Sequence, residues 1–358
     1  MKPRGTLIRS VLGLSAFVAL ALLAAMPAQA TMAFNLTATG NSNADAGFAA
    51  AGSRWSALYN DAITVNITTG FASLGGSILA QNSSVDGTYT YTNVRSALVG
   101  DQTTAHDATA VSHLQAAPAL RLYINYTANN PNGSGSATPY VDSNGNANNT
   151  TIRLSNANAK ALGLRAGNNG SNDATITFNS DFTWDFNPAD GITAGSYDFV
   201  GIATHEIGHA LGFVSGVDVL DTNSPGTGGP FNDSAFTYVS ALDLYRYSSD
   251  SVANTSLDWT AGTAAKYFSI DGGATDIAAF ATGTTHGDGR QASHWKDNLG
   301  LGVMDPTAAA GELLSITSND ITAFDVIGYN YAPVPEPVTL TLFGMGGVVM
   351  FFRSRRRG

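Results

Sequence analysis

The chain has 358 residues, of which 44% are hydrophobic and 12% are charged, with no cysteine and a net charge of −10. The apolar content is enough for a folded core and excludes a wholly disordered chain. The absence of cysteine excludes a disulfide scaffold, a thiol enzyme and a cysteine-ligated zinc finger. Without residues 1–30 and 334–358, the body carries 10 basic and 26 acidic residues. We expect so acidic a body not to bind nucleic acid.

Residues 1–30 have the features of a secretory signal peptide. Three basic residues come first, an apolar run covers residues 11–25, and Ala28 and Ala30 form an A-x-A cleavage site. The pattern predicts export, with a mature chain that starts near Thr31.

Hydrophobic periodicity predicts a mixed α+β body over residues 31–333. In chain order, we expect a helix over 43–61, a strand over 63–67, a helical stretch over 91–114, a strand over 120–126, an Asn/Gly/Ser-rich loop over 129–149, a strand over 174–178, and helices over 197–214 and 318–327. Thr317 and Asp320 resemble a capping box for the last helix, and Gly328 lies at its C-terminal end. No linker divides this stretch, so we expect one α+β domain with a long insertion.

The helix predicted over 197–214 contains the motif H-E-x-x-H, formed by His205, Glu206 and His209. Residues i and i+4 lie on the same face of a helix, so both imidazoles can reach one metal ion. The glutamate is next to the first ligand and can act on a metal-bound water without binding the metal. The flanking residues are apolar or small, as a buried active-site helix requires. The motif predicts a catalytic zinc site with Glu206 as general base.

This segment resembles the metzincin metallopeptidases, whose motif H-E-x-x-H-x-x-G-x-x-H is followed later by a methionine turn. Gly212 matches the motif, but Ser215 stands where the third histidine belongs. A catalytic zinc normally has three protein ligands, so the third must come from elsewhere. The candidates for it are Asp218, Asp243, His286 and His294.

The order of residues after the helix looks like the leishmanolysin group of metzincins. In that group a long insertion separates the helix glycine from the third histidine, which tryptophan commonly follows, with the methionine turn shortly after. His294, Trp295 and Met304 fill these places here, with an insertion over about 213–293. The resemblance implies a zincin-like domain with a mixed sheet, an active-site helix and a smaller C-terminal subdomain that carries the methionine turn. It favours His294 as the third ligand.

Three further expectations are less specific. Many metzincins carry a tyrosine two residues after the turn methionine, but this chain has Pro306, which leaves Tyr329 and Tyr331 as remote candidates to stabilise the oxyanion. The strand over 174–178 is expected at the sheet edge beside the cleft, where a peptide substrate could add as an extended strand. Calcium is a further candidate cofactor, around Asp271, Asp276 and Asp288, although no D-x-D-x-D-G loop with its closing glutamate is present.

Residues 334–358 resemble a PEP-CTERM sorting signal of Gram-negative bacteria. Val334-Pro335-Glu336-Pro337 precedes an apolar run over 338–352 and then a cluster of four arginines. Fifteen apolar residues are fewer than the roughly 20 that span a bilayer unaided. The resemblance implies transient membrane contact, an exosortase as processing partner, and a final location in the cell envelope, on the cell surface or outside the cell.

Two functions from different classes are compatible with these observations. The first is an exported zinc endopeptidase that hydrolyses peptide bonds in proteins. The second is a non-catalytic surface, matrix or adhesion protein whose metzincin-like domain is only stabilised by zinc. Glu206 favours the enzyme, because a structural zinc site needs no general base.

Overall fold

The body has a mixed α and β structure, as the sequence predicts, and its strands form several small sheets. The structure is a computed structural model that describes residues 32–223 and 229–332. The predicted signal peptide and sorting tail lie outside these residues. In the described part of the chain, no helix is both long enough and apolar enough to cross a membrane.

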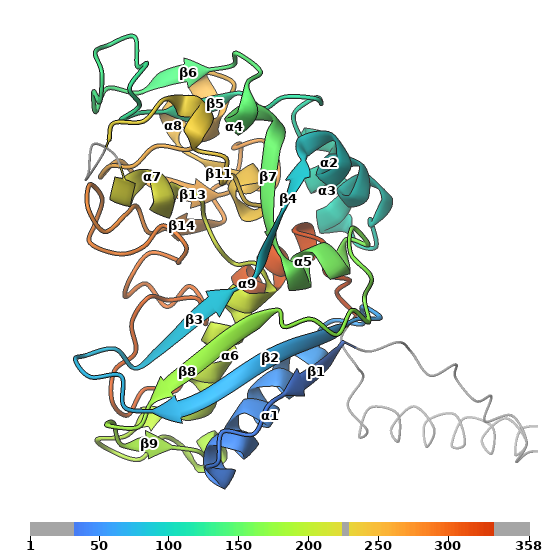
Figure 1. The fold of residues 1–358 in the computed structure, drawn as a ribbon, viewed down its shortest axis with the longest axis vertical. Coiled ribbons are helices and arrows are strands. Elements are labelled where there is room, and N and C mark those ends of the chain that lie inside the picture. The colour runs from blue at the N-terminus through green and yellow to red at the C-terminus, as the bar shows by residue number, and fades with distance from the viewer. Residues whose placement is uncertain (1–31, 224–228, 333–358) are drawn as a thin grey trace, which may run out of the picture. The chain divides into compact units, whose positions relative to one another are not determined.

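The largest sheet has four strands in the order β1-β2-β8-β3. They are β1 (Ala33–Leu36), β2 (Thr64–Ala72), β8 (Ala174–Asn179) and β3 (Ala80–Ser84), and only β3 is antiparallel to its neighbour. Helices α1 (Ser42–Ser56) and α6 (Phe199–Leu211) cover one face of this sheet (Figure 1). Strands β2 and β8 were both predicted, because Val65, Ile67 and Ile176 alternate with polar residues and are buried.

The prediction that residues 174–178 form the sheet edge is wrong. Strand β8 lies between β2 and β3, and β3 forms the edge. Its sequence, AQNSS, has no apolar alternation, which is why periodicity did not reveal a strand there.

The predicted helical stretch over 91–114 is two helices. They are α2 (Tyr91–Gly100) and α3 (Ala105–His113), and α3 begins at a capping box between Thr104 and Asp107. A cap in the middle of the stretch starts a new helix rather than continuing the old one. The capping box predicted from Thr317 and Asp320 is confirmed for α9 (Ser318–Val326).

The remaining elements are short and surround the sheet–helix unit. The strands are β4 (Asp86–Thr90), β5 (Leu122–Ile124), β6 (Tyr140–Asp142), β7 (Thr151–Ser155), β9 (Trp184–Asp185), β10 (Tyr197–Asp198), β11 (Arg246–Tyr247), β12 (Leu257–Asp258), β13 (Lys266–Phe268) and β14 (Ala278–Phe280). The helices are α4 (Ala147–Thr150), α5 (Asn156–Ala161), α7 (Val217–Asn223), α8 (Ser249–Ala253) and the 3₁₀ turns η1 (Pro188–Asp190), η2 (Asp233–Ala235) and η3 (Leu242–Tyr245). The predicted insertion over 213–293 is joined to the earlier chain, since β12 pairs in parallel with β5.

Aromatic packing fixes α6 against both α1 and the sheet. The ring of Phe199 lies 4.2 Å from that of Phe178 on β8 and 5.2 Å from that of Phe48 on α1. The fully buried Trp55 of α1 donates its indole N–H to the carbonyl of Thr204 at 3.0 Å. These contacts hold the helix that carries the H-E-x-x-H motif in one position and leave it little freedom.

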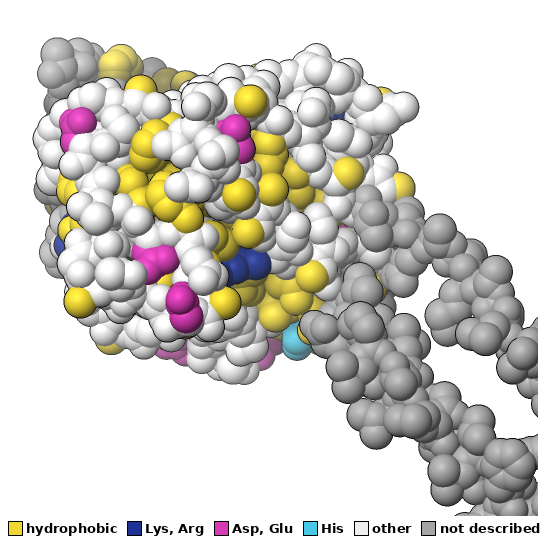
Figure 2. All heavy atoms as spheres, turned by 90° about the horizontal axis from the view of Figure 1, so that it is seen from below, with side chains coloured by type: hydrophobic (Ala, Val, Ile, Leu, Met, Phe, Trp, Pro, Cys, Tyr) yellow, Lys and Arg dark blue, Asp and Glu magenta, His cyan; other side chains and the backbone are white. Residues whose placement is uncertain are grey.

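Charged side chains are sparse on the surface. Figure 2 shows one face of the molecule, on which acidic and basic groups stand apart among uncharged atoms. Several aspartates are instead buried together near the end of α9. Burial, followed by the charge of Asp61, raises the pKa of Asp101 to about 7.

This raised pKa gives a prediction for stability against pH. Folded Asp101 binds its proton more tightly than the unfolded chain does, so its contribution to stability falls as pH rises from about 4 through about 7. We expect Asp101→Asn to stabilise the protein by about 1–2 kcal/mol at pH 8, after allowance for solvent screening, and to have no such effect at pH 4. Urea unfolding at the two pH values measures this. The exposed control Asp276→Asn should change stability by less than about 0.5 kcal/mol, and an equal gain at both pH values for Asp101→Asn would refute the mechanism.

Candidate metal centre

Both ends of helix α6 are defined by capping residues, which fix the position of its motif. Asp198 caps the start by accepting a hydrogen bond from the backbone N–H of Gly201 at 2.8 Å. At the other end Gly212 has φ +114°, a left-handed conformation that turns the chain away from the helix axis. The turn brings the carbonyl of Phe213 back to His209, 2.7 Å from its Nδ1.

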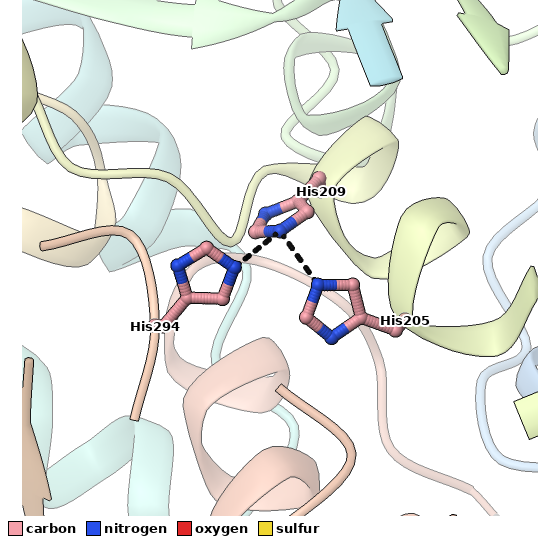
Figure 3. A group of neighbouring side chains, drawn as sticks. All are labelled: His205, His209 and His294. Atoms are coloured by element: carbon pink, nitrogen blue, oxygen red, sulfur yellow. Dashed lines mark hydrogen bonds between the residues drawn. The ribbon is translucent and has the colours of Figure 1, made fainter. Parts of the chain in front are cut away.

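The three histidines proposed from the sequence as metal ligands lie close together (Figure 3). His205 and His209 come from α6, and His294 comes from the loop after β14. The Nε2 atom of His209 lies 3.0 Å from that of His205 and 3.1 Å from that of His294. Among the described residues, these three form the only group of three or more histidine, aspartate or glutamate side chains close enough to share an ion.

The hydrogen bonds of the three rings point their lone pairs inward. Each Nδ1 faces a backbone carbonyl, which can only accept: Val303 at 2.8 Å for His205, Phe213 at 2.7 Å for His209 and Gln291 at 3.3 Å for His294. Nδ1 therefore carries the proton in each ring, and Nε2 of a neutral ring carries a lone pair. Burial lowers the pKa of His205 to about 4 and of His209 to about 3, and lowers the pKa of His294 well below its usual value, so all three rings are neutral at pH 7.

This arrangement fits a zinc ion. The lone pairs of His205 and His294 each lie about 3 Å from that of His209, and they repel it unless a cation lies between them. Zinc–nitrogen bonds of about 2.0–2.1 Å at tetrahedral angles put ligand nitrogens about 3.3 Å apart, close to the separations seen. Three imidazole donors with carbonyl partners are typical of a catalytic zinc site that leaves a fourth position open.

Glu206 lies in the same cavity as the three rings. The cavity has a volume of about 940 Å³, and its walls include all four side chains. Glu206 is 8% exposed, and burial raises the pKa of its carboxyl group to about 8. Its backbone carbonyl accepts a hydrogen bond from Asn82 on β3 at 3.0 Å, which ties the edge strand to the helix.

Met304 packs directly beneath α6. Its side chain is fully buried, and its Sδ lies only 2.5 Å from the point that a Cβ on Gly208 would occupy. The motif residue Gly208 is therefore small because the methionine fills the space against the helix. The same segment supplies the Val303 carbonyl that orients His205.

We therefore expect Gly208→Ala to destabilise the protein. The methionine must move, and overpacking of this kind costs about 1–3 kcal/mol, more than the helix gains by losing a glycine. Gly100→Ala, at the end of α2, is the matched control, because nothing lies within 4 Å of a Cβ built there. Denaturant unfolding should show a loss for the first variant and no loss for the second. Equal stability of the two would show that Met304 does not pack as described.

The other candidates for the third ligand do not join the two helix histidines. Asp243 accepts hydrogen bonds from Ser215, Gly216, Ser240 and Trp259, and His286 stacks on the ring of Tyr126. Asp218 accepts from Ala292 at 2.6 Å and from the backbone and hydroxyl of Ser293. These aspartates hold loops in place instead.

A series of polar contacts positions His294, and no local sequence pattern indicated it. The Ser293 hydroxyl bonds to Asp218 and accepts from the backbone N–H of Ser215 at 2.8 Å. On the other side, Asp320 accepts from the indole of Trp295 at 2.8 Å and from the backbone N–H of Val303 at 2.9 Å. Ser215, which replaces the expected histidine, thus supports the loop that carries the distant one.

Further residues line the cavity that sequence reasoning missed. They include Asn82 and Ser84 from β3, and Arg153, whose guanidinium lies 4.9 Å from the ring centre of Tyr238. Tyr329, a remote candidate for the oxyanion, instead donates its hydroxyl to the carbonyl of Leu211 at 2.7 Å. Neither Tyr329 nor Tyr331 is part of the cavity wall.

The aspartates considered for calcium do not gather in the described structure. Asp271 accepts hydrogen bonds from Ser269 and Thr275 in its own turn, and Asp288 pairs with Lys296 at 2.5 Å.

Comparison of the chain with protein-family models, curated proteins and solved structures found no match.

Proposed function

We propose that the protein is a zinc-dependent endopeptidase of the metzincin type, with His205, His209 and His294 as the metal ligands. The observation that carries this proposal is the convergence of three neutral imidazole lone pairs in a cavity that also holds Glu206. A zinc site that only stabilised a fold would be closed by a fourth protein ligand and would need no carboxylate beside it. Met304 as the apolar floor of the site supports the likeness to the leishmanolysin group.

The chain's own groups can carry out hydrolysis of a peptide bond. Zinc bound by the three rings would polarise the scissile carbonyl and lower the pKa of the attacking water. Glu206 takes the proton from that water and passes it to the leaving amine. Burial raises the pKa of Glu206, and a cation held by the three rings would offset this by favouring the carboxylate form. Carbonyl partners at each Nδ1 keep the rings in the tautomer that binds metal.

Strand β3 supports a protein or peptide as substrate. It is the edge of the sheet, it pairs only with β8 among the described strands, and most of it lines the cavity. An extended peptide can add to such an edge through main-chain hydrogen bonds. This assigns to β3 the role that the sequence suggested for residues 174–178.

The two ends of the chain support a location outside the cytoplasm. The signal-peptide pattern over 1–30 and the Pro-Glu-Pro, apolar, arginine order over 334–358 are consistent with export and exosortase processing in a Gram-negative cell envelope. Contact with the membrane through the tail would then be transient.

The experiment that tests the function is removal and return of the metal. The full-length protein should cleave an unstructured protein, lose the activity when zinc is chelated, and regain it when zinc is added back. If the folded protein binds one zinc per chain but cuts none of several unstructured proteins, the endopeptidase proposal fails and a surface protein stabilised by zinc becomes the better account.

A further inference from the structure

The segment from the end of β6 to the first turn of α4 carries a regular series of oxygen-bearing side chains. Asp142, Asn144, Asn146 and Asn148 alternate along the chain around Gly145. Asp233, from the 3₁₀ turn η2, lies against the same loop. Figure 1 shows β6 and α4 at the upper end of the view, with β7 running from them towards the large sheet. None of these five side chains lines the cavity of the three histidines.

The three amides all turn their N–H groups towards the two carboxylates. Asn144 and Asn146 each donate to Asp233 at 3.0 Å, one to each carboxylate oxygen. Asn148 donates to Asp142 at 2.8 Å. The five side chains therefore form one cluster, although Asp233 lies far from the others in the sequence.

Two amide oxygens in this cluster have no hydrogen-bond partner. They belong to Asn146 and Asn148, and both atoms are buried. Asn148 as a whole is 0% exposed. Because its amide nitrogen contacts Asp142, the oxygen on the same carbon lies within the cluster. A buried amide oxygen without a partner costs about 1–3 kcal/mol, so its retention at a buried position calls for a reason.

The cluster also has two buried negative charges and no positive one. Asp142 and Asp233 are each 2% exposed, and no lysine, arginine or histidine of the described residues forms an ion pair with either. Burial, and then the nearby charge of Asp233, raises the pKa of Asp142. Two buried carboxylates that have no positively charged partner would be stabilised by a dication between them.

We propose that residues 142–148 together with Asp233 form a calcium site, separate from the zinc centre and from the aspartates around Asp271. Calcium takes 6–8 oxygen ligands in flexible geometry, and carboxylate and amide oxygens are typical of them. A half-turn of an asparagine amide exchanges its nitrogen and oxygen, so the same side chains that now donate to the carboxylates can offer oxygens to an ion. The two carboxylates match the charge of the ion. Magnesium fits less well, because it keeps most of its waters and demands a strict octahedron.

A calcium ion here would join two segments that lie far apart in the sequence. The backbone N–H of Asp233 is bonded to the side chain of Asn129 at 3.0 Å, and α4 leads directly into β7, which carries Arg153 of the cavity wall. The ion would thus fasten the insertion to the loop over 129–149. Calcium should stabilise the fold without acting in the cavity.

The test is calcium binding by the full-length protein, freed of metal on a chelating resin and then given one equivalent of zinc. Calorimetric titration with calcium should show one site, and 10 mM calcium should raise the melting temperature by about 3–8 °C for affinities usual in extracellular proteins. The variant carrying both Asp142→Asn and Asp233→Asn should lose both effects. Asp271→Asn is the matched control and should keep them. Absence of binding by the parent protein, or binding by the double variant equal to that of the parent, would overturn the proposal.

A second variant keeps the test decisive if the double variant does not fold. Asn148→Asp replaces the side-chain amide, whose oxygen has no partner, with a carboxylate of the same shape. Without calcium it should melt below the parent protein, because a third buried charge joins two others. With calcium its rise in melting temperature should exceed that of the parent. A loss that calcium does not reverse would show that Asn148 serves only as a hydrogen-bond donor, and the site would be rejected. Because the readouts are melting temperature and bound calcium, this outcome does not depend on peptidase activity.

Discussion

Replacing Glu206 with glutamine is expected to lower kcat/KM for peptide hydrolysis by a factor of about 10²–10⁴ while zinc stays bound, because a positioned general base contributes that much. Glutamine has the same shape as glutamate and fits the same space, but it cannot take a proton from water. The three imidazoles that we propose as metal ligands are unchanged. The measurement is steady-state hydrolysis of an unstructured protein, with zinc content determined on the same preparation.

The matched control is Glu312→Gln. Glu312 is exposed and accepts a hydrogen bond from the backbone N–H of Ala309 within its own turn at 2.7 Å. It should retain full activity. If Glu206→Gln keeps both its zinc and its activity, Glu206 is not the base, and the assignment of the cavity as a peptidase site loses its main support.

Replacing His294 with alanine is expected to remove the zinc. Two imidazoles from one helix remain, and a catalytic zinc normally needs three protein ligands. Zinc affinity should fall by more than the roughly 10–100-fold loss that follows when a hydrogen-bond partner of a ligand is replaced. Zinc competition with a chromophoric chelator measures it directly, without reference to activity.

His286→Ala is the control that separates the two histidines of this region. His286 stacks on Tyr126 with ring centres 4.2 Å apart, and it is not part of the group formed by His205, His209 and His294. Its replacement should leave zinc affinity unchanged. The opposite pattern, with zinc lost from His286→Ala and kept by His294→Ala, would contradict the ligand assignment.

The parts of the fold that sequence predicted are those with a regular apolar period. Helices α1, α6 and α9 and strands β2 and β8 each bury one face against the same core, so periodicity located them. Strand β3 was not predicted, because its own side-chain pattern does not indicate a strand. Pairing with β8 and the hydrogen bond from Asn82 to α6 stabilise it instead. The break between α2 and α3 was not predicted, because it depends on the cap that Thr104 forms at the start of α3.

The candidate site divides in the same way. His205, Glu206 and His209 were evident because their spacing on one helix is a local property. His294 lies 85 residues beyond His209, and only its order before Trp295 and Met304 suggested it. The supports supplied by Asp218 and Asp320 depend on how distant loops meet, which no local pattern encodes.

The loop over 129–149 was expected to lack regular structure because it is rich in asparagine and glycine. It contains β6 and α4, and its asparagines are partly buried around Asp142. Polar composition predicted only a loop, whereas in the fold these side chains form hydrogen bonds with Asp142 and Asp233. Asparagine-rich sequence is therefore compatible with a built polar cluster.

The most direct test of the central claim is one measurement on the full-length protein. Zinc per chain and the products formed from an unstructured protein are determined in the same sample, the products by mass spectrometry. The account predicts one zinc per chain and fragments whose masses correspond to hydrolysis of internal peptide bonds, both lost when the metal is removed. One zinc per chain with the substrate left intact would contradict it.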